Sequence, residues 1–188
     1  MILGYYLQGQ DNDSFLNSNL YEKNISDCLG FVKNREKYIT QDFKIKQTKY
    51  EFSYTYDGAL IVSQRFKEFC KNNKLKEIEF YPLKNQQDYY LLKVKKIIDF
   101  DVDRRNTQFL EFNESCNEYN EVVGATPICL KENRQLDIGF YRTNIEFGRG
   151  HAKSPLILVD PKTFNLIKKE KFKGLYGEAV LDKYDWEE

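Results

Sequence analysis

The chain has 188 residues, of which 41% are hydrophobic and 15% are aromatic, so it can bury a sizeable core. Lys plus Arg equals Asp plus Glu at 29 each, which excludes the global excess of charge that draws proteins onto nucleic acid or anionic membranes. No apolar run approaches the roughly 18 residues of a membrane span, and the opening MILGYYLQ lacks the features of a secretion signal. We therefore expect a cytoplasmic globular protein.

The four cysteines are widely spaced and show neither a CxxC motif nor the Cys/His pairing of a zinc site. We expect Cys28, Cys70, Cys116 and Cys129 to be buried free thiols, as is usual in the cytoplasm. No cofactor-binding motif is present, so no cofactor is predicted.

The N-terminal third predicts strands separated by polar loops. Residues 1–8, MILGYYLQ, carry the bulky side chains of a first strand, and the polar segment 9–19 predicts a loop. Imperfect alternation of apolar and polar residues over 42–56 predicts one or two strands. The sequence YDG then predicts a turn before ALIV.

The clearest helix follows the apolar run ALIV. Ser63 can accept a hydrogen bond from a free amide of the first helical turn, and Phe66, Phe69 and Cys70 lie at i, i+3 and i+4 on one face. The polar sequence KNNK at 71–74 ends this helix. The sequence IEFYPL at 78–83 then predicts a strand that stops near Pro82.

A similar pattern recurs at an offset of 97 positions, where residues 60–78 align without gaps to residues 157–175. In this alignment, the predicted helix cap Ser63 corresponds to Asp160, and Phe69 and Cys70 correspond to Leu166 and Ile167. The alternative is that any two amphipathic helices preceded by strands align this well. The alignment favours two related halves, at 42–100 and 136–181.

Further strand candidates lie between the two copies, at residues 88–100, 107–112, 124–132 and 136–143. No linker rich in Pro, Gly or Ser divides the chain. The sequence therefore predicts a single α+β domain over 1–188, with a mostly antiparallel sheet and two similar strand-helix-strand modules packed together.

The segment FGRGHAKS at 147–154 concentrates two glycines, Arg149, Lys153 and the only histidine, His151. It is not a P-loop, because Ala152 replaces the second glycine of that motif and a strand rather than a helix follows. We interpret it as an exposed connection into the next strand. His151 is a candidate general acid or base, but a binding contact or a structural role is the more common use of such a residue.

Three carboxylates alternate in the segment DFDVDRR. Asp99, Asp101 and Asp103 would share one face of a strand, where they could hold Mg²⁺ or Ca²⁺. The calcium-loop pattern fails at Arg104, where a glycine is required. A solvated strand end or an acidic contact surface are the alternatives.

Two further features have ordinary explanations. The 14 Tyr and 14 Phe residues suit protein interfaces, but they also suit sheet packing. Lysine-rich stretches are mixed with glutamates and lack an arginine-aromatic platform, so nucleic-acid binding is not expected.

Four features occur together in this chain: the LVS-like run at 60–63 leading into a helix, the strand that ends at Pro82, the pattern Y-x-L-x-V at 90–94, and Asp99. In these features the sequence resembles a family of immunity proteins from bacterial polymorphic toxin systems, a family once known only as a domain of unknown function. GFYRT departs from the family's FR element by the insertion of Tyr141. The resemblance covers roughly 42–181 and implies a cytoplasmic protein that neutralises a cognate toxin by binding it.

We therefore expect a binding protein more than an enzyme, with a toxin domain as its partner. The predicted partner-binding residues are Arg142, Glu146, Arg149, His151, Asp99, Asp101 and Asp103. The alternative is a metal-dependent hydrolase or nuclease that uses Asp99, Asp101, Glu146 and His151. An adaptor with no toxin partner is a third hypothesis.

Overall fold

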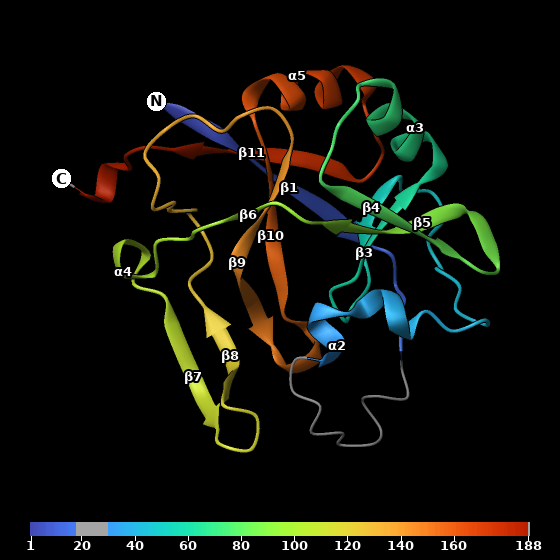
Figure 1. Cartoon of the computed structure of the whole chain (residues 1–188), viewed down its shortest axis with the longest axis horizontal. Coiled ribbons are helices and arrows are strands. Elements are labelled where there is room, and N and C mark those ends of the chain that lie inside the picture. The colour runs from blue at the N-terminus through green and yellow to red at the C-terminus, as the bar shows by residue number, and fades with distance from the viewer. Residues whose placement is uncertain (18–29, 188) are drawn as a thin grey trace.

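The computed structural model describes residues 1–17 and 30–187, and these form one continuous mixed structure of strands and helices (Figure 1). The strands are β1 (Ile2–Asp11), β2 (Phe52–Tyr54), β3 (Leu60–Ser63), β4 (Ile78–Leu83), β5 (Gln86–Val94), β6 (Ile97–Ile98), β7 (Gln108–Asn113), β8 (Glu118–Val123), β9 (Phe140–Arg149), β10 (Ser154–Val159) and β11 (Leu175–Leu181). The α-helices of the described ranges are α2 (Gly30–Lys33), α3 (Gln64–Asn72), α4 (Val102–Arg105) and α5 (Pro161–Glu170). Short 3₁₀ helices are η1 (Arg35–Tyr38), η2 (Gly150–Ala152) and η3 (Asp185–Glu187).

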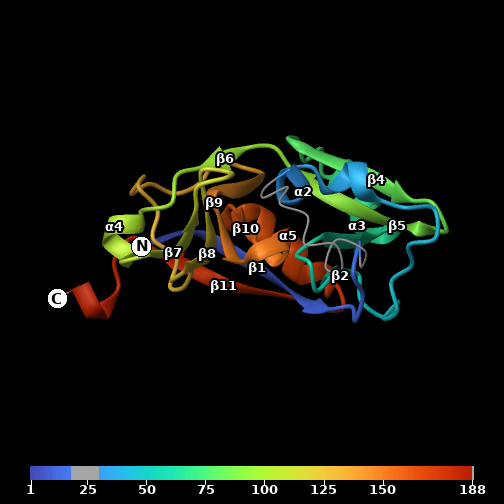
Figure 2. The same cartoon turned by 90° about the horizontal axis from the view of Figure 1, so that it is seen from below.

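The eleven strands form one sheet in the order β4-β5-β3-β2-β1-β10-β9-β8-β7, with β11 also paired to β1 and β6 to β9. All pairs are antiparallel except β1–β2 and β6–β9. The long strand β1 runs along the molecule and meets β2 at its far end (Figure 2). The prediction of a mostly antiparallel α+β structure is therefore confirmed.

Both long helices begin at the predicted caps. The Ser63 hydroxyl accepts a hydrogen bond from the Phe66 amide at 3.2 Å. The Asp160 carboxylate accepts from the amides of Lys162 at 2.8 Å and Thr163 at 3.1 Å, and its second oxygen accepts from Gly139 at 2.9 Å. Each cap satisfies amides that have no partner within the helix.

Helices α3 and α5 lie side by side over the sheet (Figure 1) and share one hydrophobic core, which we call the helix core. Phe66 of α3 is fully buried, and its ring lies 5.0 Å from Phe172, 5.4 Å from Phe52 and 6.1 Å from Phe140, between ring centroids. Strands β2 and β9, which are far apart in the sequence, therefore pack against the same aromatic cluster.

Two further clusters complete the interior. A second core lies between β1, β9 and the start of the β7–β8 hairpin, and it includes Leu3, Phe100, Phe147 and Leu158. A third core lies beneath α2 and η1, and it includes Phe31, Phe43, Ile61 and Leu91. The β7–β8 hairpin forms one edge of the sheet and projects from its main body (Figure 1).

Several predicted elements have different bounds. The candidate at 42–56 contains only β2, and the candidate at 88–100 divides into β5 and β6, which pair with different strands. The candidate at 124–132 is not a strand: it forms a single bridge from Leu130 to Phe100, and Pro127 lacks the amide that a strand ladder needs. Strand β8 was not predicted, because only Val122 and Val123 in EYNEVV are apolar.

The cysteine prediction is confirmed for Cys70 and Cys129, which are buried free thiols. It is wrong for Cys116, between β7 and β8, which is disulfide-bonded. Cys28 lies outside the described residues. In the two described ranges, no helix is long and apolar enough to cross a membrane.

We predict that Phe66→Ala lowers the free energy of unfolding by about 4 kcal/mol, because it opens a cavity among four other phenylalanines. The matched control is Phe112→Ala in β7, a residue that is 51% exposed, with an expected change within about 0.5 kcal/mol. Urea denaturation of both variants measures the difference. Equal losses would contradict the assignment of Phe66 to the centre of the core.

Candidate functional site

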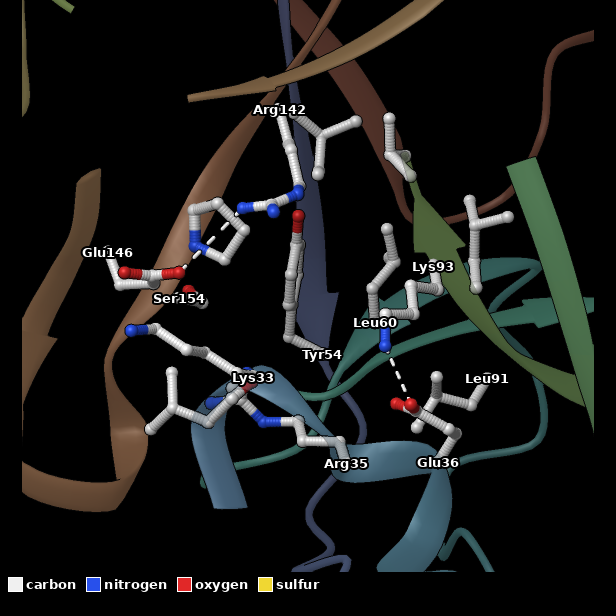
Figure 3. Close-up of a pocket in the computed structure, with 16 residues that line it drawn as sticks. Lys33, Arg35, Glu36, Tyr54, Leu60, Leu91, Lys93, Arg142, Glu146 and Ser154 are labelled. Atoms are coloured by element: carbon white, nitrogen blue, oxygen red, sulfur yellow. Dashed lines mark hydrogen bonds and ion pairs between the residues drawn. The ribbon is translucent and has the colours of Figure 1, made fainter. Parts of the chain in front are cut away.

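A pocket of about 90 Å³ lies between β9 and β10 on one wall and β3 and β5 on the other, with α2 and η1 along one side (Figure 3). We call it the charged pocket. Its charged and aromatic lining residues are Lys33, Arg35, Glu36, Tyr54, Lys93, Arg142 and Glu146. Apolar side chains, including Leu60, Leu91, Val94, Pro155 and Ile157, form the rest of its surface.

A bulge in β9 brings Arg142 and Glu146 together. In a regular strand, residues four apart would lie about 13 Å apart. Here Arg142 pairs with Ile157 and Glu146 with Pro155, so four steps along β9 match two steps along β10. The Thr143 hydroxyl accepts the Leu156 amide at 2.9 Å, which replaces a backbone ladder bond at the bulge. The two charged groups therefore lie 3.7 Å apart, from Arg142 Nη1 to Glu146 Oε1.

The opposite wall carries a second ion pair. Lys93 Nζ in β5 lies 2.6 Å from Glu36 Oε1 in η1, and both side chains are largely buried. Lys33, at the mouth, is 3.6 Å from Glu118 of β8 and keeps 55% of its side chain exposed. Glu36 is therefore closely paired, whereas Arg142 and Lys33 have only loose ionic contacts.

Arg142 has unused hydrogen-bonding capacity. A guanidinium has five N–H donors in a planar fork. In the described part of the chain, the single polar contact of this guanidinium is the one with Glu146, which is too long for a hydrogen bond. Its side chain is 28% exposed, so most of the side chain is shielded from water. An additional acceptor in the pocket would satisfy these donors.

Tyr54 enters the pocket from β2, and its hydroxyl points toward the Arg142 guanidinium (Figure 3). Burial raises the pKa of Tyr54 strongly, and the neighbouring Tyr6 raises it further, while Arg35 acts in the opposite direction. The phenol therefore stays neutral and can donate a hydrogen bond.

Arg35, by contrast, has a structural role. Only 7% of this residue is exposed, and its guanidinium donates hydrogen bonds to the backbone carbonyls of Val32, Asp57, His151 and Lys153 at 2.6 to 3.1 Å. Gly58 makes this approach possible, since it has a φ of 74° and a Cβ there would lie 2.8 Å from Arg35 Nη2. Arg35 thus fixes η1 to the turn between β9 and β10.

The segment FGRGHAKS is not the exposed connection that the sequence predicts. Phe147, Gly148 and Arg149 belong to β9, and η2 follows directly. Lys153 is only 5% exposed and its ammonium donates to the Tyr119 carbonyl at 2.6 Å. Burial lowers the pKa of Lys153, although Glu118 and Glu146 act against this shift.

The predicted site residues between 142 and 151 lie in three places. Arg142 and Glu146 line the charged pocket. His151 packs edge-on against Phe31, with ring centroids 5.7 Å apart, and its carbonyl accepts from Arg35. Arg149 lies at the end of β9 and pairs with Glu111 of β7 at 2.9 Å.

The predicted acidic face of Asp99, Asp101 and Asp103 is wrong in its geometry. Strand β6 ends at Ile98, and Asp101 is the N-cap of α4, where its carboxylate accepts the Arg104 amide at 3.0 Å. Asp103 lies in the first turn of that helix. Over residues 1–17 and 30–187, no group of three His, Cys, Asp or Glu side chains could hold a metal ion. The structure therefore does not gather Asp99, Asp101, Glu146 and His151 into a metal site.

Sequence reasoning missed Lys33, Glu36, Tyr54 and Lys93, which come from three separate segments. One signal was available: Lys93 interrupts the apolar strand LLKV, and a charge inside a buried strand needs a partner. That partner, Glu36, could not be identified without the fold.

No protein-family model matches this chain, and no curated protein matches it. The pocket must therefore be interpreted from its own chemistry.

We predict opposite roles for the two pocket arginines. Arg35→Lys should lower the free energy of unfolding by about 3 kcal/mol, because a single ammonium cannot reach four carbonyls and leaves buried acceptors unsatisfied. Arg142→Lys should change it by less than about 0.5 kcal/mol. Thermal or chemical denaturation checks both. Equal stability of the two variants would show that Arg35 is not a structural residue.

Proposed function

We propose that this chain is a non-catalytic binding protein that neutralises a bacterial toxin domain, as do the immunity proteins that its sequence resembles. The observation that carries the proposal is the Arg142 guanidinium, held in a pocket with apolar walls and without a hydrogen-bond partner among the described residues. Arginine and tyrosine in such settings are the residue types that contribute most to protein interfaces.

The proposed contact surface extends from the charged pocket to the β7–β8 hairpin. Lys33 connects the two, because it lines the pocket and contacts Glu118 at the start of β8. On the hairpin, Leu110, Phe112 and Tyr119 are each about 40 to 50% exposed, and Phe112 packs edge-on against Tyr119 with ring centroids 5.0 Å apart. Exposed aromatic side chains close to a charged pocket suit a protein partner.

Of the residues predicted from sequence, Arg142, Glu146 and Arg149 fit this surface best. Arg149 pairs with Glu111 on the hairpin. His151 serves the packing around Phe31, and Asp101 caps α4. Asp99 and Asp103 are exposed and remain predictions for a second contact area beside α4.

We also propose that the two halves arose by duplication. The helix caps Ser63 and Asp160, the left-handed residues Lys74 and Lys171, and the strand starts Ile78 and Leu175 all keep the offset of 97 positions. In the first half, β5 pairs with both β3 and β4. In the second, β1 pairs with both β10 and β11, so the N-terminal strand occupies the equivalent place.

The test begins with affinity capture of the tagged chain from its source cells and identification of a stoichiometric partner. Expression of that partner should kill cells, and co-expression of this chain should restore growth. Arg142→Glu should weaken binding of the purified partner by about 2 kcal/mol, roughly 30-fold, through charge reversal at the pocket. Calorimetry or surface plasmon resonance measures the affinity.

The control is Arg134→Glu, at an exposed arginine between β8 and β9 that pairs with Glu132 and Asp137 instead of lining the pocket. It should bind like the wild type. A partner whose toxicity persists in the presence of this chain would contradict neutralisation. Equal affinity of both variants would contradict the assignment of the pocket to the interface.

A further inference from the structure

The charged pocket has a polar end and an apolar wall. Arg142, Tyr54 and Lys33 bring donor groups to it from β9, β2 and α2 (Figure 3). The opposite wall presents apolar side chains, including Leu60, Leu91 and Val94, beside the Lys93–Glu36 ion pair. A ligand that fits both must carry an acceptor at one end and apolar atoms at the other.

The charges that line the pocket favour an anion. Four cationic side chains, Lys33, Arg35, Lys93 and Arg142, face two carboxylates, Glu36 and Glu146. Arg35 is engaged by backbone carbonyls, and Lys93 is engaged by Glu36 at 2.6 Å. Arg142 and Lys33 have longer ionic contacts, at 3.7 Å to Glu146 and 3.6 Å to Glu118, so they are the cationic groups better placed to meet an anion.

Glu146 restricts which anion fits. Its carboxylate lies 3.7 Å from Arg142 and is itself largely buried, so it repels a second negative charge brought to the same guanidinium. That repulsion is about twice as large for a doubly charged phosphate as for a carboxylate. The planar carboxylate also matches the two-pronged geometry of a guanidinium. A volume of about 90 Å³ accommodates a side chain and not a drug-sized molecule.

We infer that the charged pocket receives one glutamate side chain from a protein partner, with its carboxylate on Arg142 and Tyr54 and its methylenes on the apolar wall. The identity of that partner as a toxin rests on the proposed function. The chemistry of the pocket does not, so the two can be tested apart.

The first experiment is an NMR titration of the whole protein with N-acetyl-glutamate amide and its neutral match, N-acetyl-glutamine amide. The signals to follow are the Arg142 Nε–Hε pair and the Tyr54 ring. We expect saturable shifts with a dissociation constant in the millimolar range for the glutamate probe, and binding at least about tenfold weaker for the glutamine probe. Equal shifts from both probes would overturn the inference.

Two further probes distinguish other sources of negative charge. Inorganic phosphate should bind more weakly than the glutamate probe because of Glu146, and N-acetyl-leucine tests a chain-terminal carboxylate. Stronger binding of phosphate, or of N-acetyl-leucine, would replace the glutamate assignment with that ligand. In Glu146→Gln, the difference in affinity between the glutamate probe and phosphate should become smaller, because the repelling carboxylate is gone.

Variants locate the binding. Arg142→Gln should abolish the saturable shifts, whereas Arg134→Gln, at an exposed arginine outside the pocket, should keep them. Unchanged binding in Arg142→Gln would contradict the site. If the glutamate probe binds as expected but no toxin is neutralised, the proposed function fails and the pocket inference stands. If a toxin is neutralised but the probe does not bind the pocket, the pocket inference fails and the proposed function stands.

Discussion

Strand β1 is the constraint on which the two sides of the molecule depend. Over its length it pairs with β11 and β10, and at Gln10 and Asp11 it turns to pair with β2 in parallel. Its side chains also contribute to two cores, with Leu7 in the helix core and Leu3 in the second core. The wall of β9 and β10 and the wall of β2, β3 and β5 are therefore joined through one backbone. The charged pocket lies between these two joined walls.

The third side of the pocket depends on polar interactions instead of a strand ladder. Helices α2 and η1 are too short to be stable by themselves, so tertiary contacts must hold them in place. Arg35 provides these contacts through carbonyls from three segments, and Phe31 anchors the same region in the third core. Arg35 thus holds the pocket together through backbone carbonyls. The Arg142 guanidinium makes no such bonds to the backbone among the described residues and can meet a ligand.

Local features of the fold could be predicted from sequence, and long-range ones could not. Ser63 and Asp160 were identified as caps because capping involves only the next three residues. The buried face of α3 followed from spacing alone, through Phe66, Phe69 and Cys70. Strand β8 could not be predicted, because a strand in an exposed hairpin does not need alternating apolar residues. The segment at 124–132 is wrongly predicted as a strand, because its apolar residues are buried without forming a strand ladder.

The candidate site shows the same division. Arg142 and Glu146 stood out as charges in a sheet-like segment, but their contact depends on the bulge at Thr143, which no local pattern encodes. Asp101 illustrates the opposite error, because a carboxylate that alternates with others in sequence was needed as a helix cap. Aspartate is among the residues favoured at the N-cap, because its carboxylate accepts a free amide of the first helical turn.

The zero net charge of the chain also limits how the pocket can act. Without a surplus of one sign over the whole molecule, long-range attraction of a partner is weak and association proceeds at an ordinary rate. In the proposed complex, Arg142 would act instead at contact, where its guanidinium would gain an acceptor and Glu146 would repel excess negative charge. Electrostatics of this kind selects between partners more than it accelerates their encounter. Such an arrangement would serve the proposed function, in which one partner must be recognised among many similar ones.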